Sequence, residues 1–119
     1  MNLQQLIDQL ELTVLTESRD FADIIPSGGY SSDLLSCVMA GAKKGNIWIT
    51  LQAHLNIVAI AALNELAAII ITEYAQPDSA CIAKANQQGV ILLSTSQPTY
   101  EINGKLWELG IQQWTALKR

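Results

Sequence analysis

The sequence has 119 residues, of which 50% are hydrophobic and only 15% are charged. This length fits a single domain, because most domains contain roughly 100–150 residues. The high apolar fraction excludes a disordered chain, which would lack the residues needed to form a core. A small domain with so few charges is also expected to bury a patch against a second copy of itself.

The charge balance makes nucleic acids unexpected partners. Seven Lys and Arg residues against eleven Asp and Glu residues give a net charge of −4 at pH 7. Nucleic-acid binding needs a basic stripe, because contacts with phosphates supply most of the affinity. The basic clusters are limited to Lys43–Lys44 and Lys118–Arg119. The sequence therefore predicts no nucleic-acid partner.

The cysteines and the histidine do not form a metal-binding pattern. Cys37 and Cys81 stand alone, and His54 is the only histidine. Because the sequence has no CxxC or Cys/His ligand spacing, we expect no structural zinc and no cofactor. Both cysteines lie in segments with helical patterns, where a buried thiol is the usual outcome, and a disulfide is the alternative.

No segment of the sequence predicts a membrane span or a secretion signal. The N-terminus has neither a basic region nor a long apolar run. Within the poorly charged segment Asn46–Thr72, the longest unbroken apolar run is Ile57–Leu63. Crossing a bilayer needs about 20 apolar residues. We therefore expect no membrane partner and a cytoplasmic protein.

Residues 1–30 predict a helix, a strand and a loop. Apolar residues recur at helical spacing at Leu3, Leu6, Ile7 and Leu10. The segment Glu11–Thr16 changes towards a period of two and predicts a short strand. The polar segment Glu17–Pro26, followed by Gly28 and Gly29, predicts the main irregular loop.

The next segment predicts a capped helix. Ser31 or Ser32 followed by Asp33 predicts the helix start, because a hydroxyl cap and a negative charge favour the positive end of the helix dipole. Lys43–Lys44 is expected in the last turn, and Gly45 is expected to end the helix.

Residues 46–72 predict a buried strand–helix–strand unit. Asn46–Leu51 is rich in β-branched and aromatic residues, which favour a strand. A helix is expected from Asn56 to Leu66. Its Ile57–Leu63 part is apolar on every face, so it is either buried on all sides or part of a subunit interface. Ala67–Thr72 is a continuous apolar run, typical of a central parallel strand.

The remaining segments repeat the alternation of helices and strands. A helix is expected from Pro77–Asp78 to Gln88, a buried strand over Val90–Thr95, and a helix over Thr99–Leu109. Strands that alternate with helices imply right-handed crossovers and a mostly parallel sheet.

The predicted fold is therefore α/β, a three-layer sandwich with a central sheet of about four or five strands. We expect one domain over residues 1–111 and a C-terminal tail over residues 112–119.

A glycine-rich segment precedes the predicted helix start and is a candidate anion site. A loop that leads into a helix N-terminus can hold an anion on its free backbone N–H groups. The segment lacks the Lys of a GxxxxGK[ST] phosphate loop, and the sequence has no such motif elsewhere. The alternative is a tight turn followed by a helix cap. The candidate residues are Ser27, Gly28, Gly29, Ser31 and Ser32.

Polar residues also follow three of the predicted strands. Open parallel sheets bind ligands beyond the carboxyl ends of their strands. The residues at these ends are Gln52 and His54, then Glu73 and Tyr74, and then Ser94, Thr95 and Ser96. We expect Gln52, His54 and Ser94–Ser96 to line a ligand crevice. The alternative is that these polar residues simply belong to loops.

His54 is the one candidate for acid–base chemistry near neutral pH. Catalysis would need an orienting carboxylate and a nucleophile nearby, and the sequence does not place either beside His54. A structural role in capping the following helix is the favoured interpretation. We therefore predict no catalytic residue and no enzyme, with a small enzyme that uses His54 and a hydroxyl nucleophile as the alternative.

Three segments closely resemble the DRTGG domain family. They are Ser27–Ser36 (SGGYSSDLLS), Gly45–His54 (GNIWITLQAH) and Gly89–Ser96 (GVILLSTS), the last followed by Thr99–Glu101. The sequence also looks like the N-terminal domain of bacterial HPr kinase/phosphorylase. The resemblance covers residues 3–111.

The resemblance implies a regulatory or assembly unit. DRTGG domains occur alone or beside CBS domains, phosphotransacetylase modules and pyrophosphatase modules. In this sequence Ile25–Gly29 keeps the two glycines and a hydroxyl residue but loses the Asp and Arg of the name-giving motif, which puts any role of that charged pair in doubt. The kinase activity of the HPr enzyme belongs to a separate P-loop domain, so the resemblance implies no kinase activity here.

Two functions are therefore expected from the sequence. The first is a non-catalytic regulatory or interaction domain that forms a homodimer and acts through a protein partner or a small ligand. The alternative is a sensor domain that binds a small anionic metabolite or a nucleotide in a crevice at the carboxyl ends of the strands.

Overall fold

The computed structural model describes residues 1–112. The helices in this range are α1 (Leu3–Gln9), the short 3₁₀ helix η1 (Phe21–Asp23), α2 (Leu35–Gly41), α3 (Asn56–Leu63), α4 (Ser79–Gln88) and α5 (Thr99–Glu108). The strands are β1 (Thr13–Val14), β2 (Gly28–Ser31), β3 (Asn46–Thr50), β4 (Ala68–Ile71) and β5 (Leu92–Ser94). Apart from residue 112, the expected C-terminal tail lies outside the described residues.

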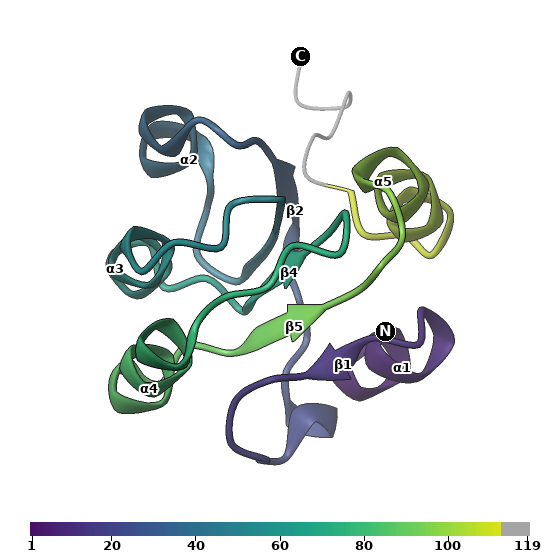
Figure 1. Cartoon of the computed structure of the whole chain (residues 1–119). Coiled ribbons are helices and arrows are strands. Elements are labelled where there is room, and N and C mark those ends of the chain that lie inside the picture. The colour runs from purple at the N-terminus through teal and green to yellow at the C-terminus, as the bar shows by residue number, and fades with distance from the viewer. Residues whose placement is uncertain (113–119) are drawn as a thin grey trace.

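The strands form one five-stranded sheet in the order β1-β5-β4-β3-β2 (Figure 1). The strands β2 to β5 run parallel to their neighbours, and β1 runs antiparallel to β5. In this register Ile47 lies opposite Ala68, and Ile69 lies opposite Leu92. The sheet confirms the predicted fold class. It adds β1 as an antiparallel edge strand, which the sequence analysis placed in the chain but not in the sheet.

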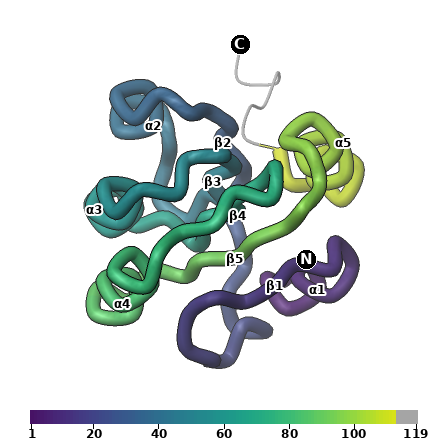
Figure 2. The backbone as a smooth tube through the Cα atoms, in the orientation of Figure 1, coloured from purple at the N-terminus to yellow at the C-terminus, as the bar shows by residue number. Residues whose placement is uncertain are grey.

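Helices cover both faces of the sheet, as Figures 1 and 2 show. The helices α2, α3 and α4 lie on one face, and α1 and α5 lie on the other. Along β4, Ile69 and Ile71 contribute to the core under α2–α4, whereas Ala68 and Ile70 contribute to the core under α1 and α5. Because β4 is buried on both faces, every residue of the strand must be apolar, which explains its continuous apolar run.

The last two helices follow the sequence prediction closely. The carboxylate of Asp78 accepts a hydrogen bond from the backbone N–H of Cys81 at 2.9 Å and caps α4. Gly89 ends this helix in the left-handed region, at φ 73°. A residue with a Cβ is strained in that region, which is why glycine is the usual helix terminator.

The helix α2 is shorter at both ends than predicted. It begins at Leu35 without a side-chain cap and ends at Gly41, before Lys43–Lys44. Asp33, whose charge was expected to favour the start of this helix, instead accepts hydrogen bonds from the end of β3. Gly28 and Gly29 belong to β2 and not to an irregular loop. Gly28 and Gly29 are in a strand because pairing with β3 extends order into a segment that local signals mark as a turn.

The helix α3 also ends earlier than predicted, at Leu63 instead of Leu66. Asn64 follows it, and its side-chain amide donates to the backbone carbonyls of Val38, Met39 and Ala42 at 3.1–3.2 Å. These hydrogen bonds join α3 to the end of α2. The expected burial of α3 on all sides is wrong for this chain by itself, because Ala59 and Leu63 are exposed.

The two cysteines are not bonded to each other and lie in different surroundings. Cys81 is buried as expected, but Cys37 is exposed on α2. Desolvation by burial, with a smaller contribution from Asp78, raises the pKa of the Cys81 thiol above its usual value. Among residues 1–112, no helix is long and apolar enough to cross a membrane.

Candidate functional site

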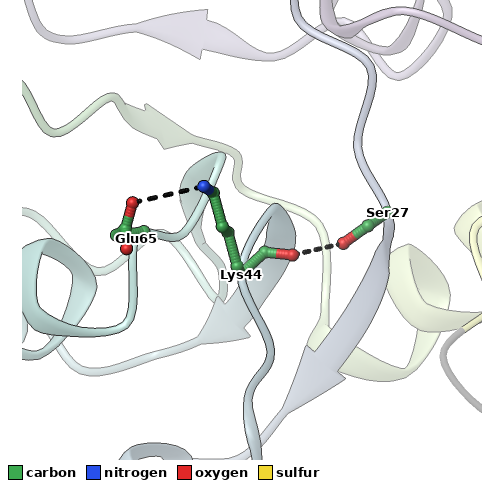
Figure 3. A network of polar contacts seen from close by, with 3 residues as sticks. All are labelled: Ser27, Lys44 and Glu65. Atoms are coloured by element: carbon green, nitrogen blue, oxygen red, sulfur yellow. Dashed lines mark hydrogen bonds and ion pairs between the residues drawn. The ribbon is translucent and has the colours of Figure 1, made fainter.

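The structure separates Ser27 from the other candidate site residues. Ser27 lies just before β2, at the amino edge of the sheet. Its hydroxyl donates to the carbonyl of Lys44 at 2.7 Å (Figure 3). The same hydroxyl accepts from the amide of Asn46 at 3.1 Å. Lys44 in turn forms an exposed ion pair with Glu65, with 3.6 Å between Nζ and Oε2. The side chain of Ser27 therefore connects the start of β2 to the loop before β3.

The backbone of the glycine-rich segment belongs to the sheet, where the anion hypothesis expected a loop. The residues Gly28–Ser31 pair with Asn46–Ile49 of β3. The N–H groups of the flanking residues Ser27 and Ser32 donate to Gly45 and Ile49. Because β2 is an edge strand, its pairing with β3 engages the N–H groups that face β3 and not those on its outer side. The hydroxyl of Ser31 accepts from the amide of Asn103 at 3.0 Å.

At the carboxyl edge of the sheet, Asp33 joins the ends of β2 and β3. One carboxylate oxygen accepts from the hydroxyl of Thr50 at 2.7 Å and from the backbone N–H of Leu51 at 2.9 Å. The side-chain amide of Gln52 donates to the carbonyl of Asp33 at 3.0 Å. The hydroxyl of Ser32 accepts from the N–H of Leu34. Ser32 and Gln52 are thus close together, and internal hydrogen bonds occupy both.

His54 lies at the start of α3 with its side chain exposed. Its Nδ1 atom accepts from the backbone N–H of Asn56 at 3.2 Å. The residues described here include no carboxylate bonded to the imidazole. This arrangement supports the interpretation of His54 as a helix-capping residue.

The loop after β4 is a strained turn that connects to the loop after β5. Glu73 and Tyr74 both adopt left-handed backbone conformations, at φ 61°. The N–H of Glu73 donates to Gln97 at 3.0 Å, and the N–H of Tyr74 donates to Thr95 at 3.1 Å. The carboxylate of Glu73 accepts from the N–H of Thr99 at 2.7 Å and therefore caps α5.

An open cleft of about 720 Å³ lies at the carboxyl end of β5, and we call it the β5 cleft. The antiparallel β1 brings residues 11–15 to this edge, beside the loops that follow β4 and β5. The lining residues are Glu11, Thr13, Leu15, Tyr74, Gln76, Ser94, Thr95, Ser96, Gln97 and Lys105.

The cleft brings together one part of the predicted site and leaves the rest outside. Ser94–Ser96 line it, whereas Gln52 and His54 do not. Ser31 and Gly29 line a separate, more apolar hollow of about 200 Å³ between β2 and α5. The predicted crevice residues therefore occupy several places along the sheet and do not form one site.

Several cleft residues were absent from the sequence-based site. They include Glu11, Thr13, Gln97 and Lys105. The side chain of Gln97 donates to the carbonyl of Leu10 and accepts a short hydrogen bond from Lys105 Nζ. A polar run after β5 was visible in the sequence, but the contribution of β1 depends on a long-range antiparallel pairing that carries no local signal.

The charges in the β5 cleft are few and of both signs. Its lining contains one cation, Lys105, and one anion, Glu11. Across the described range, no group of three or more His, Cys, Asp or Glu side chains is placed to hold a metal ion. The cleft is therefore a nearly neutral surface of hydroxyl and amide groups.

Comparison with known proteins finds a similar structure but no similar sequence. No protein family and no curated protein matches the sequence. The fold is similar to the crystal structure of the CBS and DRTGG domains of the regulatory region of Clostridium perfringens pyrophosphatase, complexed with the activator diadenosine tetraphosphate. The TM-score is 0.74 at 14% sequence identity, over 98% of this chain.

This chain covers 52% of the matched pyrophosphatase chain and so corresponds to about half of that regulatory region. At this level of identity the similarity concerns the fold alone. It supports, at the level of the fold, the resemblance to DRTGG domains that the sequence segments suggested. This chain shares the α/β fold found in that CBS and DRTGG region.

Proposed function

We propose that this protein is a non-catalytic regulatory domain that acts as a homodimer through the outer face of α2 and α3. The observation that carries the proposal is the lack of charge on these neighbouring helices. Residues 34–42 and 51–64 contain no Asp, Glu, Lys or Arg. Cores of protein interfaces are depleted in charged residues, whereas exposed helices usually carry them.

The exposed side chains of these two segments are also unusually apolar. Leu63 is 69% exposed, and Leu34, Met39 and Leu55 are exposed as well. The helices lie side by side on one face of the sheet (Figure 1), and Asn64 bonds them together. Large apolar side chains on two adjoining helices are typical of a surface that a partner covers. A second copy of the chain supplies an equivalent surface.

A regulatory role agrees with the shared fold and with the hydrogen bonding of His54. The similar pyrophosphatase structure is a regulatory region in complex with an activator. In this protein the imidazole of His54 accepts a hydrogen bond from the start of α3 and has no bonded carboxylate among the described residues. This arrangement supports a structural role for His54 over an acid–base role.

The homodimer is tested by measuring the molar mass with light scattering after size-exclusion chromatography. We expect wild type at high micromolar concentration to show twice the 13.0 kDa chain mass. Leu63→Glu should shift the protein to the monomer, because it places a charge in the interface. Ile25→Glu is the matched control, since Ile25 is 65% exposed and follows Ile24, which packs against the core under α1 and α5. A wild-type monomer under these conditions would contradict the proposal.

A second candidate function is a ligand sensor, and the β5 cleft favours it. The cleft gathers Ser94, Thr95 and Ser96, which are part of the predicted crevice, on a surface of ligand-binding size. A thermal-shift panel of nucleotides, nucleosides and phosphorylated metabolites tests this function. A ligand that binds only the folded state adds about 2.7 kcal/mol of stability at 100 times its Kd. No shift with any compound would argue against a sensor.

A further inference from the structure

We propose that the β5 cleft binds an uncharged nucleoside-like ligand, with a flat aromatic ring and hydroxyl groups, and does not bind a polyphosphate. This inference rests on the sensor function proposed above and specifies its ligand class. Three features of the cleft support it: an unpaired hydroxyl in its wall, carboxylates at the positions where phosphates would bind, and an exposed aromatic ring.

The hydroxyl of Ser94 is the clearest sign of a missing partner. Ser94 is only 7% exposed, yet no hydrogen bond from residues 1–112 reaches its side chain. Every fully buried side-chain oxygen or nitrogen in this range has a partner, so this hydroxyl must reach the surface of the cleft. A polar group in such a recess is usually hydrogen-bonded. A ligand hydroxyl or ring nitrogen would satisfy it.

The electrostatics of the cleft disfavour a polyphosphate. Phosphates bind to helix N-termini and to clusters of Arg and Lys. The protein's own carboxylates already occupy the two nearest helix N-termini, because Glu73 caps α5 at 2.7 Å and Asp78 caps α4 at 2.9 Å. The single cation of the lining, Lys105, already donates to Gln97. The negative charge of Glu11 offsets the positive charge of Lys105.

Tyr74 supplies a surface on which a flat ring can stack. The residue lines the cleft and is 71% exposed. Its backbone is fixed in the left-handed turn by the hydrogen bond from its N–H to Thr95, and its carbonyl accepts from the amide of Gln76. Aromatic side chains on a fixed backbone stack against nucleobases with little sequence preference. The volume of about 720 Å³ can hold a nucleoside.

The test is titration calorimetry of the full chain with adenosine, guanosine, cytidine, uridine and ATP. We expect at least one nucleoside to bind, and ATP to bind at least tenfold more weakly than adenosine. Ser94→Ala should weaken nucleoside binding at least tenfold because the hydroxyl partner is lost. Tyr74→Ala should have a similar effect because the stacking surface is lost.

Two control variants match these substitutions. Ser18→Ala changes an exposed serine in the loop after β1, away from the proposed dimer face, and Tyr100→Ala removes an exposed tyrosine; neither residue lines the cleft. Both should bind the nucleoside as wild type does, and circular dichroism of all four variants should show the wild-type fold.

Three results would overturn the inference. They are the absence of nucleoside binding at millimolar concentration, tighter binding of ATP than of adenosine, and unchanged affinity in both Ser94→Ala and Tyr74→Ala. If a phosphorylated metabolite stabilises the protein while no nucleoside binds, the sensor function stands and this ligand class is wrong. If no compound of either kind binds, the sensor function fails together with the inference, and the homodimer is still judged by its own experiment.

Discussion

Asp33 stands at a position where a local signal and a tertiary contact compete. By sequence it belongs to the first turn of a helix, where an acidic side chain favours the helix dipole. In the fold its carboxylate bonds instead to Thr50 and Leu51, and α2 begins two residues later at Leu35. The buried hydroxyl of Thr50 would otherwise lack an acceptor at the end of a central strand. A contact between distant residues therefore decides the role of this side chain, and no local pattern could predict it.

Substitution of Asp33 tests its role at the end of β3. We expect Asp33→Ala to lower the free energy of unfolding by about 2 kcal/mol, because two hydrogen bonds to a charged acceptor are lost. Asp23→Ala is the control, since Asp23 is exposed and its carboxylate forms no hydrogen bond with the described residues. Urea denaturation of both variants provides the measurement. Equal stability of the two variants would show that Asp33 contributes little.

The sequence was enough to predict which helices and strands exist, but it was less reliable for the residues at which they begin and end. The segments that became β3, β4, α4 and α5 carry strong patterns together with capping residues such as Asp78 and Gly89. The predicted ends of α2 and α3 were wrong because the end of each helix depends on contacts with the other. Asn64, just after α3, donates to three carbonyls at the end of α2. Terminal carbonyls of a helix lack partners within it, so a neighbouring element can decide where the helix stops.

The connection between these helices gives a prediction for Asn64. Asn64→Ala should lower the free energy of unfolding by about 1–3 kcal/mol, because the carbonyls at the end of α2 lose their donor. The matched control is Asn103→Ala, which removes a single exposed hydrogen bond to Ser31. Chemical denaturation gives the stability, and hydrogen exchange of α2 should accelerate in the first variant alone. Unchanged exchange in α2 would contradict the proposed connection.

For the whole molecule, alternation of strands and helices was enough to predict the parallel sheet and its two helical layers. It was not enough to predict the β5 cleft. The cleft exists because β1 returns antiparallel to β5 and brings Glu11 and Thr13 to the carboxyl edge. Ser94–Ser96 were predictable because every parallel strand ends at that edge, whereas Gln52 and His54 end at the same edge but outside the cleft. Strand order, which is a long-range property, separates these two groups.

The positions of the cleft and of the proposed dimer face lead to a last prediction for the whole molecule. The helix α4 starts shortly after Gln76 of the cleft and packs against α3 of the dimer face. A ligand that orders the loop before α4 should therefore change the affinity between protomers. Linkage requires the effect to be reciprocal, so dimerisation must change ligand affinity by the same factor, roughly 5- to 150-fold for typical allosteric coupling. Sedimentation of wild type with and without nucleoside measures the first effect, and calorimetry on monomeric Leu63→Glu measures the second. Equal nucleoside affinity in the monomer and the dimer would show that the two surfaces act independently, and the domain would then report ligand binding by a route other than its own association.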